Sequence, residues 1–159
     1  MKDELDNSKF QASFSQLTTF PVNRFHPLVW INGNPMIGED TFIGAMSEVN
    51  AKGAQVKIGC NCDIASFVSI NVADSHKRCI GLSDEIQRRN IEIGDSVFIG
   101  SHSLVKGGAI IGHHSVVAAG TIVEGTYIPP YSLVFGNPMQ LRPSYYREKL
   151  ILTGKIAND

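Results

Sequence analysis

One polar stretch of the chain, residues 71–90, holds the side chains best suited to acid–base chemistry. His76 lies within it, and an imidazole with a reference pKa of about 6.5 takes a proton from a hydroxyl or an amine near neutral pH. Asp74, Asp84 and Glu85 lie in the same stretch, and each is a candidate to fix the tautomer of His76. The competing interpretation is a solvated histidine on a charged loop.

The sequence offers no convincing metal site. Cys60 and Cys62 form an isolated pair with one residue between them, and no set of His, Cys and carboxylates has the spacing of metal ligands. We interpret the pair as one outward thiol and one small inward residue of the fold.

The cysteine count also indicates the compartment. The third cysteine is Cys79, and an odd, low number of cysteines indicates a reducing compartment, which predicts a cytoplasmic protein.

The polar stretch interrupts a repeat of period six. Residues 31–134 hold 25 of the 29 Ile and Val residues, so they form the structural unit. The repeated positions are Ile31, Ile37, Ile43, Val49, Ile58, Ile64, Ile70, Ile93, Ile99, Val105, Ile111, Val117 and Val123. Glycine often follows, and a small residue is common four positions later, as at Thr41, Ser47, Cys62, Ser103, Ala109, Ser115 and Thr121. A hexapeptide period is typical of a parallel β-helix.

Each hexapeptide predicts one short strand and one corner, and three of them make a triangular coil of about 18 residues. Coils stack at roughly the 4.8 Å strand spacing, with the aliphatic and the small residues pointing into the prism. We expect the glycine after each aliphatic to adopt backbone angles that a Cβ would penalise. The alternative fold is an ordinary β-sandwich, which thirteen positions in one frame disfavour.

Two insertions break this frame, and a solenoid must expel an insertion as a loop. Three extra residues lie between Val49 and Ile58, and 17 lie between Ile70 and Ile93. The longer insertion predicts an excursion loop over about residues 72–90, which includes His76. Long loops in compact domains are often functional, so we expect the chemistry here.

Composition predicts the remaining organisation. Residues 1–30 are expected to form an N-terminal arm or cap, residues 31–142 the β-helix domain, and residues 143–159 a helical tail.

The charge balance and hydropathy argue against two classes of partner. Lys and Arg total 14 against 15 Asp and Glu, which argues against a nucleic-acid partner. No apolar run approaches the roughly 20 residues that span a bilayer, and the start lacks the apolar run of a secretory signal, so no membrane partner is expected.

The repeat, the loop with His76 and the closing segment IPPYSLVFGNP at residues 128–138 together resemble the hexapeptide-repeat acyltransferases of the left-handed β-helix superfamily. The similarity covers roughly residues 31–142. It points to the galactoside, maltose and xenobiotic acetyltransferase branch, which includes sugar acetyltransferases of surface polysaccharide and lipopolysaccharide biosynthesis. The resemblance implies left-handed coils, a homotrimer with active sites between subunits, and acetyl-CoA as co-substrate without a metal.

Matched positions imply roles for single residues. His76 matches the catalytic histidine of the family, although Asp74-Ser75-His76 is one residue longer than the related threonine-glycine-histidine form. A residue of the neighbouring chain is as good a candidate to orient His76 as Asp74, Asp84 or Glu85. From their places at and in the loop, Asn71 and Glu85 are candidates for contacting the acceptor. The implied cofactor-binding residues are Phe98, Ser101, Gly108, Ala119 and Arg142. Arg142 is included because Gln140 stands where relatives usually have a basic residue.

The expected reaction is direct acetyl transfer from acetyl-CoA to an oxygen or nitrogen of a sugar or nucleotide-linked sugar, with His76 as general base. Two alternatives stay open. One is an acetyltransferase for a non-sugar small molecule such as an antibiotic or an amino acid. The other is a non-catalytic trimeric β-helix scaffold, which would not bind CoA.

Overall fold

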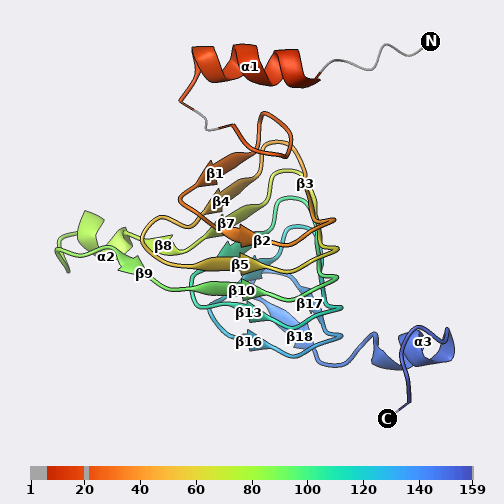
Figure 1. Ribbon diagram of the computed structural model, residues 1–159. Helices are drawn as coiled ribbons and strands as arrows, with labels where there is room; N and C mark the ends of the chain where they lie inside the picture. The colour runs from red at the N-terminus through yellow and green to blue at the C-terminus, as the bar shows by residue number, and fades with distance from the viewer. Residues whose placement is uncertain (1–6, 20–21, 159) are drawn as a thin grey trace.

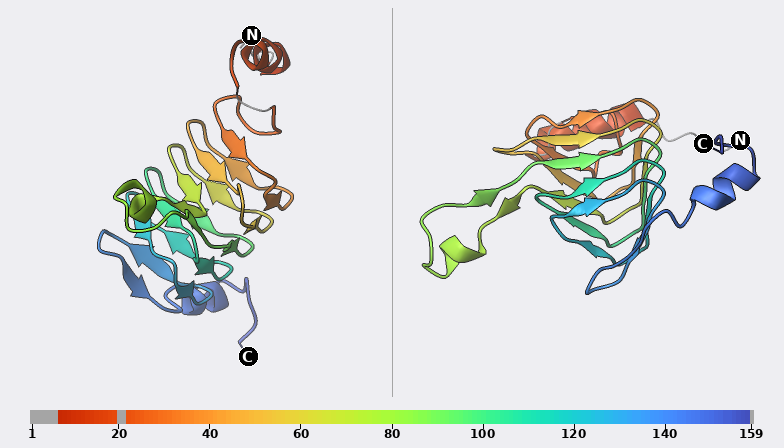
Figure 2. Two further views of the ribbon diagram at one scale, coloured as in Figure 1. Left: turned by 90° about the vertical axis from the view of Figure 1, so that its left-hand side faces the viewer. Right: turned by 90° about the horizontal axis from the view of Figure 1, so that it is seen from below.

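In the computed structural model, which describes residues 7–19 and 22–158, the chain winds into a triangular prism (Figure 1). Each coil places one short strand on each of three sheets, which we call sheets A, B and C. Seen from below in Figure 2, a loop leaves one corner of the prism and the C-terminal segment lies on the opposite side. The predicted all-β solenoid, a left-handed parallel β-helix, is confirmed.

Sheet A contains β1 (Trp30–Asn32), β4 (Glu48–Asn50), β7 (Ser69–Asn71), β12 (Leu104–Lys106) and β15 (Ile122–Val123). Sheet B contains β2 (Met36–Ile37), β5 (Val56–Ile58), β10 (Ile91–Ile93), β13 (Ile110–Ile111) and β16 (Tyr127–Ile128). Sheet C contains β3 (Phe42–Ile43), β6 (Asp63–Ile64), β11 (Phe98–Ile99), β14 (Val116–Val117), β17 (Leu133–Phe135) and β18 (Gln140–Arg142). Only β18 runs antiparallel to its neighbour in these three sheets. We name the corners AB, BC and CA after the sheets that they join in chain direction.

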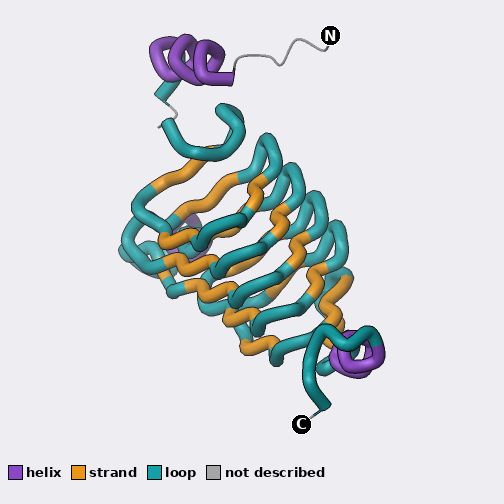
Figure 3. Tube along the Cα trace, turned by 45° about the vertical axis from the view of Figure 1, so that its right-hand side comes forward, coloured by secondary structure: helices purple, strands orange, loops and turns teal. Residues whose placement is uncertain are grey.

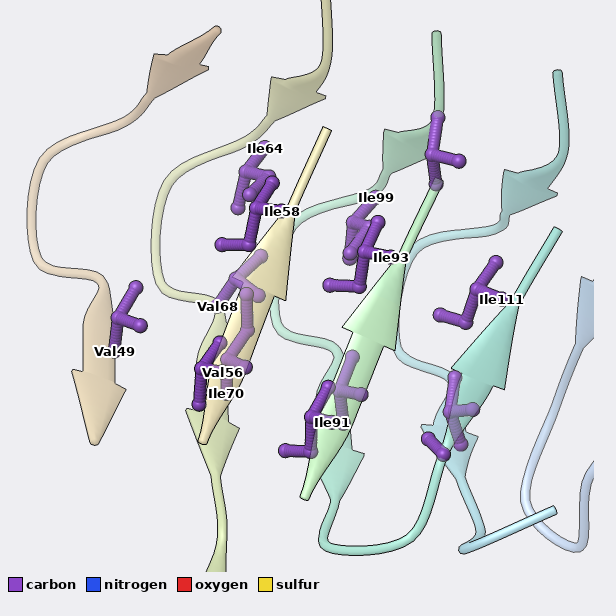
Figure 4. Packing of buried hydrophobic residues seen from close by; sticks show 14 of the residues in the cluster. Val49, Val56, Ile58, Ile64, Val68, Ile70, Ile91, Ile93, Ile99 and Ile111 are labelled. Atoms are coloured by element: carbon purple, nitrogen blue, oxygen red, sulfur yellow. The ribbon is translucent and has the colours of Figure 1, made fainter. Parts of the chain in front are cut away.

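The strand register stacks the repeated aliphatic residues in columns inside the prism (Figure 4). On sheet B, Ile58 pairs with Ile37 on one side and with Ile93 on the other. Eleven of the thirteen predicted inward aliphatics are buried. The exceptions, Ile31 and Ile37, lie in the first coil at the end of the prism and are half-buried against the core. The predicted inward register is therefore correct.

The small inward residues join consecutive coils through hydrogen bonds. The Ser47 hydroxyl donates to the Ala65 carbonyl over 3.0 Å and accepts from the Val68 backbone N–H over 3.1 Å. Cys62 takes the same place in its own hexapeptide, at the BC corner, where its thiol donates to the Gly94 carbonyl over 3.1 Å. Burial raises the pKa of the Cys62 thiol, so it stays protonated and able to donate. The buried polar groups are thus satisfied within the prism.

The glycines that follow the aliphatics are required for a reason other than the one predicted. Gly38 and Gly94 do not have positive φ angles. A Cβ on Gly38 would lie 2.6 Å from the backbone nitrogen of Cys60 in the next coil, and one on Gly94 would lie 2.7 Å from that of His113. Positive φ occurs two residues later, as at Asp40 with φ 54°. The expectation about glycine backbone angles is wrong, because close stacking of coils excludes the Cβ.

Helices lie at both ends of the prism and in the loop (Figure 3). Helix α1 (Asn7–Leu17) is joined to the segment before β1 by a hydrogen bond of 2.9 Å from Gln11 Nε2 to the Phe25 carbonyl. Helix α3 (Arg147–Leu152) follows β18 in the predicted tail. Within residues 7–19 and 22–158, no helix combines the length and the apolarity that crossing a membrane requires.

Adjacent isoleucines give a direct test of the register. Ile111 is 1% exposed and Ile110 is 42% exposed on the same strand. We expect Ile111→Asp to prevent folding, because an unpaired buried carboxylate costs several kcal/mol, whereas Ile110→Asp should fold. Thermal unfolding followed by circular dichroism measures the difference. Two variants with equal melting temperatures would contradict the register.

Candidate functional site

The long insertion forms a structured arm at the AB corner of the third coil, between β7 and β10. The arm contains β8 (Ala73–Asp74), α2 (His76–Cys79) and β9 (Gln87–Arg88). Strands β8 and β9 pair antiparallel, so the insertion leaves and returns as a ribbon that stands away from the prism (Figures 1 and 2). The residues predicted as a loop over 72–90 therefore hold one short helix at the end of a two-stranded stem.

Asn71 sets the turn by which the chain leaves the prism. Its Oδ1 accepts a hydrogen bond from the Ala73 backbone N–H over 2.8 Å and another from Asn50 Nδ2 over 3.2 Å. An asparagine that bonds the backbone two residues later is typical of a tight turn. Asn71 thus shapes the base of the arm, and it also lines the cavity described below.

His76 and Asp74 form a hydrogen-bonded pair. His76 Nδ1 lies 2.5 Å from Asp74 Oδ1, and the same oxygen accepts the His76 backbone N–H over 3.1 Å. The two side chains are 60% and 45% exposed. The bond from the His76 side chain, followed by that from its backbone, lowers the pKa of Asp74. With a neutral imidazole that donates through Nδ1, Nε2 presents a lone pair to a substrate.

A cavity of about 220 Å³ lies between the base of the arm and sheet A, and of the pair Asp74 lines it whereas His76 does not. Its polar lining includes Asn71, Asp74, Gln87, Arg89 and Lys106. Lys106 is held by an ion pair of 2.8 Å with Glu124. The cavity is smaller than the roughly 300–1,000 Å³ of ligand pockets, so it accommodates part of a substrate. Gln87 was not singled out in the sequence, because only the pairing of β9 with β8 brings it to Asp74.

The structure separates the other predicted residues from this cavity. Glu85 lies between α2 and β9 and does not line the cavity; its backbone N–H bonds the Ser83 hydroxyl. Ser101 and Ala119 lie at the CA corner, between β11 and β12 and between β14 and β15. Phe98 faces outward on sheet C and is 40% exposed. One chain by itself therefore does not assemble the predicted site.

Two further cofactor candidates have neighbours within their own chain. Gly108 lies at the AB corner with φ 96°, and a Cβ there would lie 3.1 Å from Nη1 of Arg89. The side chain of Arg89 therefore covers the surface that we expected to face the cofactor. The guanidinium of Arg142 on β18 lies 5.1 Å from the ring centre of Phe135 and 5.9 Å from that of Tyr145. These aromatic contacts orient the cation at the C-terminal end of the prism.

The residues that the structure describes contain no group of three or more His, Cys, Asp or Glu placed to hold a metal ion. The pair His113 and His114, whose Nδ1 atoms lie 3.0 Å apart at the BC corner, packs against the ring of Tyr131. Burial lowers the pKa of His114. This cluster lies at a different corner of the prism from His76.

Comparison with known proteins agrees with this fold. Residues 90–125 match a family model described as bacterial transferase hexapeptide (six repeats), and residues 36–71 match one described as hexapeptide repeat of succinyl-transferase. No curated protein matches the sequence significantly.

Solved structures with the same architecture include three transferases. A hexapeptide-repeat acetyltransferase from Vibrio cholerae has 26% identity and a TM-score of 0.63, over 89% of this chain and 83% of that one. The polySia-specific acetyltransferase NeuO has 27% identity and a TM-score of 0.58, over 72% and 60%. A mutant N-acyltransferase from Bacillus cereus, in complex with dTDP-4-amino-4,6-dideoxyglucose and coenzyme A, has 17% identity and a TM-score of 0.70, over 86% and 77%.

The fold and these matches define a hexapeptide-repeat protein with a left-handed β-helix. The transferase descriptions of both family models, and acetyltransferase neighbours of 26% and 27% identity, support acyl transfer as the class of activity.

The bond between His76 and Asp74 predicts a titration that NMR can follow. Because the folded pKa of Asp74 is lowered, the bond contributes stability above the ordinary carboxyl pKa of about 3.9 and is lost as the pH falls through the folded value. His76→Ala should raise the pKa of Asp74 toward its ordinary value, as measured by carboxyl ¹³C shifts. Lys77→Ala is the control on the same helix and should leave it unchanged. An unchanged pKa in His76→Ala would contradict the pairing.

Proposed function

We propose that this protein transfers an acetyl group from acetyl-CoA to a hydroxyl or amino group of a sugar, free or nucleotide-linked. The observation on which this proposal rests is the hydrogen bond between His76 and Asp74, since Asp74 lines the polar cavity at the base of the arm. The acceptor class is supported by the structural relatives, one of which acts on polySia and another of which binds a dTDP-linked amino sugar with coenzyme A.

His76 is the general base in this proposal. Its Nε2 removes the proton from the acceptor as the acceptor oxygen or nitrogen attacks the thioester carbonyl carbon. A backbone N–H stabilises the oxyanion of the tetrahedral intermediate. The carbon–sulfur bond then breaks, the acetyl group stays on the acceptor, and the departing CoA thiolate takes the proton from His76 Nε2, which regenerates the base. Asp74 accepts the Nδ1–H bond and so holds the neutral imidazole in the tautomer whose lone pair is on Nε2.

Both substrates react directly in a ternary complex, without an acyl-enzyme. Cys62 is buried and its pKa is raised, which disfavours the thiolate that a nucleophile needs. Cys79 is exposed on α2, three residues after His76, and no hydrogen bond joins it to the imidazole among the described contacts. Cys62 and Cys79 therefore have no part in the proposed reaction.

The working unit in this proposal is a homotrimer whose sites lie between subunits. His76 lies on an arm at the AB corner, whereas Ser101 lies at the CA corner, so a neighbouring chain is needed to bring the two types of corner together. The outer surface also has apolar side chains for such contacts. Phe42 and Phe98 on sheet C are 59% and 40% exposed, and Phe67 at the CA corner is 51% exposed.

Replacement of the base tests the chemistry. His76→Ala should lower the acetyl-transfer rate by about 10²-fold or more, because general base catalysis is lost. Acetyl-CoA should still bind at one site per chain in calorimetry, and free CoA should bind as well. Cys79→Ser is the matched control and should keep the wild-type rate. Absence of CoA binding in the wild type would favour the scaffold, and near-unchanged turnover in His76→Ala would remove His76 from the role.

Mixed assemblies test whether the site is shared between chains. Ala119→Trp fills the exposed CA corner and should be inactive by itself, as should His76→Ala. If the site combines His76 of one chain with Ala119 of the next, an equal mixture refolded together should regain about one quarter of the active sites. The separately refolded variants, mixed afterwards, are the control. No recovery on refolding together, with trimers present by light scattering, would place both residues in one chain.

A further inference from the structure

Two consecutive arginines at the end of the arm, Arg88 and Arg89, lie against the prism on opposite sides of the third coil. Arg88 Nε donates to the Lys52 carbonyl over 3.0 Å at the AB corner of the second coil. Arg89 extends the other way, along the AB corner of the fourth and fifth coils, where its side chain lies over Gly108 and Gly125. The arm is therefore held by the coil before it and by the coils after it.

Glycines at the AB corner provide the space for both side chains. A Cβ on Gly53 would lie 2.7 Å from Cδ of Arg88, and a Cβ on Gly125 would lie 2.9 Å from Nη2 of Arg89. Gly53 has φ 81°, which by itself favours glycine, but Gly125 does not have a positive φ. The absence of a side chain at Gly125 is explained instead by the close approach of Arg89 and of the Gly107 carbonyl.

The arm has no core of its own. Helix α2 has no buried residue, and Ile80 and Leu82 beyond it are 66% and 74% exposed. The stem is two residue pairs long, Ala73 with Arg88 and Asp74 with Gln87. A segment with so few buried contacts opens easily, so the contacts at its base decide where it points.

We propose that Arg88 and Arg89 are positioning residues that clamp the arm and thereby set the place of the His76–Asp74 pair relative to the rest of the site. This proposal rests on the proposed role of His76. The register supports it, because Arg88 pairs with Ala73 and the next residue along β8 is Asp74. A displacement of Arg88 or Arg89 moves Asp74 through the stem, and a shift of about 1 Å at a reacting group costs about 10²-fold in rate.

Arg89→Ala tests the clamp, with Arg78→Ala as the matched control. Both remove one positive charge from the arm, but Arg78 lies on α2, in the exposed tip of the arm. In Arg89→Ala, kcat should fall at least about tenfold, while KM for acetyl-CoA and for the acceptor stays within about twofold. Arg78→Ala should keep wild-type values. In a His76→Ala background, Arg89→Ala should have no further effect, because both changes act through the same group.

Amide hydrogen exchange provides a readout that needs no activity. Exchange over residues 73–88 should be faster in Arg89→Ala than in the wild type and in Arg78→Ala, while the strands of the prism keep their protection. Equal exchange in all three proteins would overturn the clamp. If the wild type has a protected arm but transfers no acetyl group, the proposed function fails and the clamp stands.

Kinetics separates the clamp from the main alternative, in which Arg89 binds an anionic acceptor in the cavity. An unchanged kcat with a raised KM for the acceptor would overturn the clamp in favour of that role. Equal losses in Arg89→Ala and Arg78→Ala would mean that charge alone matters, which also overturns it. Arg89→Lys keeps the charge but not the planar group that lies on Gly108 and Gly125, so it should remain defective.

Discussion

The stacking of one coil directly on the next constrains every other feature of the molecule. Parallel strands pair at fixed register, so Ile58 lies between Ile37 and Ile93. Inward hydroxyls bond to the backbone of the following coil, as Ser47 does with Ala65 and Val68. A backbone this close leaves no room for a Cβ after the aliphatic residue. These three requirements together produce the hexapeptide pattern in the sequence.

The same constraint decides where variation is possible. A strand within a stacked sheet cannot hold an extra residue without losing its register, so insertions leave at corners. Both breaks in the repeat lie at the AB corner, the short one between β4 and β5 and the long one between β7 and β10. The prism keeps its core of buried Ile and Val, while the arm that carries His76 has no buried residue in its helix. The stabilising core and the proposed chemistry thus reside in different parts of the chain.

A triangular prism also limits what one chain can assemble. Its faces are nearly flat, and residues at different corners are kept apart by the core. The His76–Asp74 pair and its cavity belong to the AB corner, whereas Ser101 and Ala119 belong to the CA corner. This geometry supports the proposal of a site shared between neighbouring chains, because the AB corner of one prism can then meet the CA corner of another. In this proposal the position of the arm matters for catalysis, since the arm reaches across the cleft between chains.

The sequence by itself determined the parts of this protein that repeat or lie close along the chain. Period six predicted the coils, the inward aliphatics and the place of the arm, because each repeat obeys the same local rule. The sequence also places Asp74 two residues before His76, but it left Asp84, Glu85 and a residue of a neighbouring chain as further candidates. The turn before α2 brings Asp74 into hydrogen bonding with His76. Tertiary structure alone decided the rest. Gln87 at the cavity, and Arg89 over Gly108 and Gly125, depend on the antiparallel stem and on stacking between coils. Such contacts join residues that are distant in sequence, and no periodic pattern contains their positions.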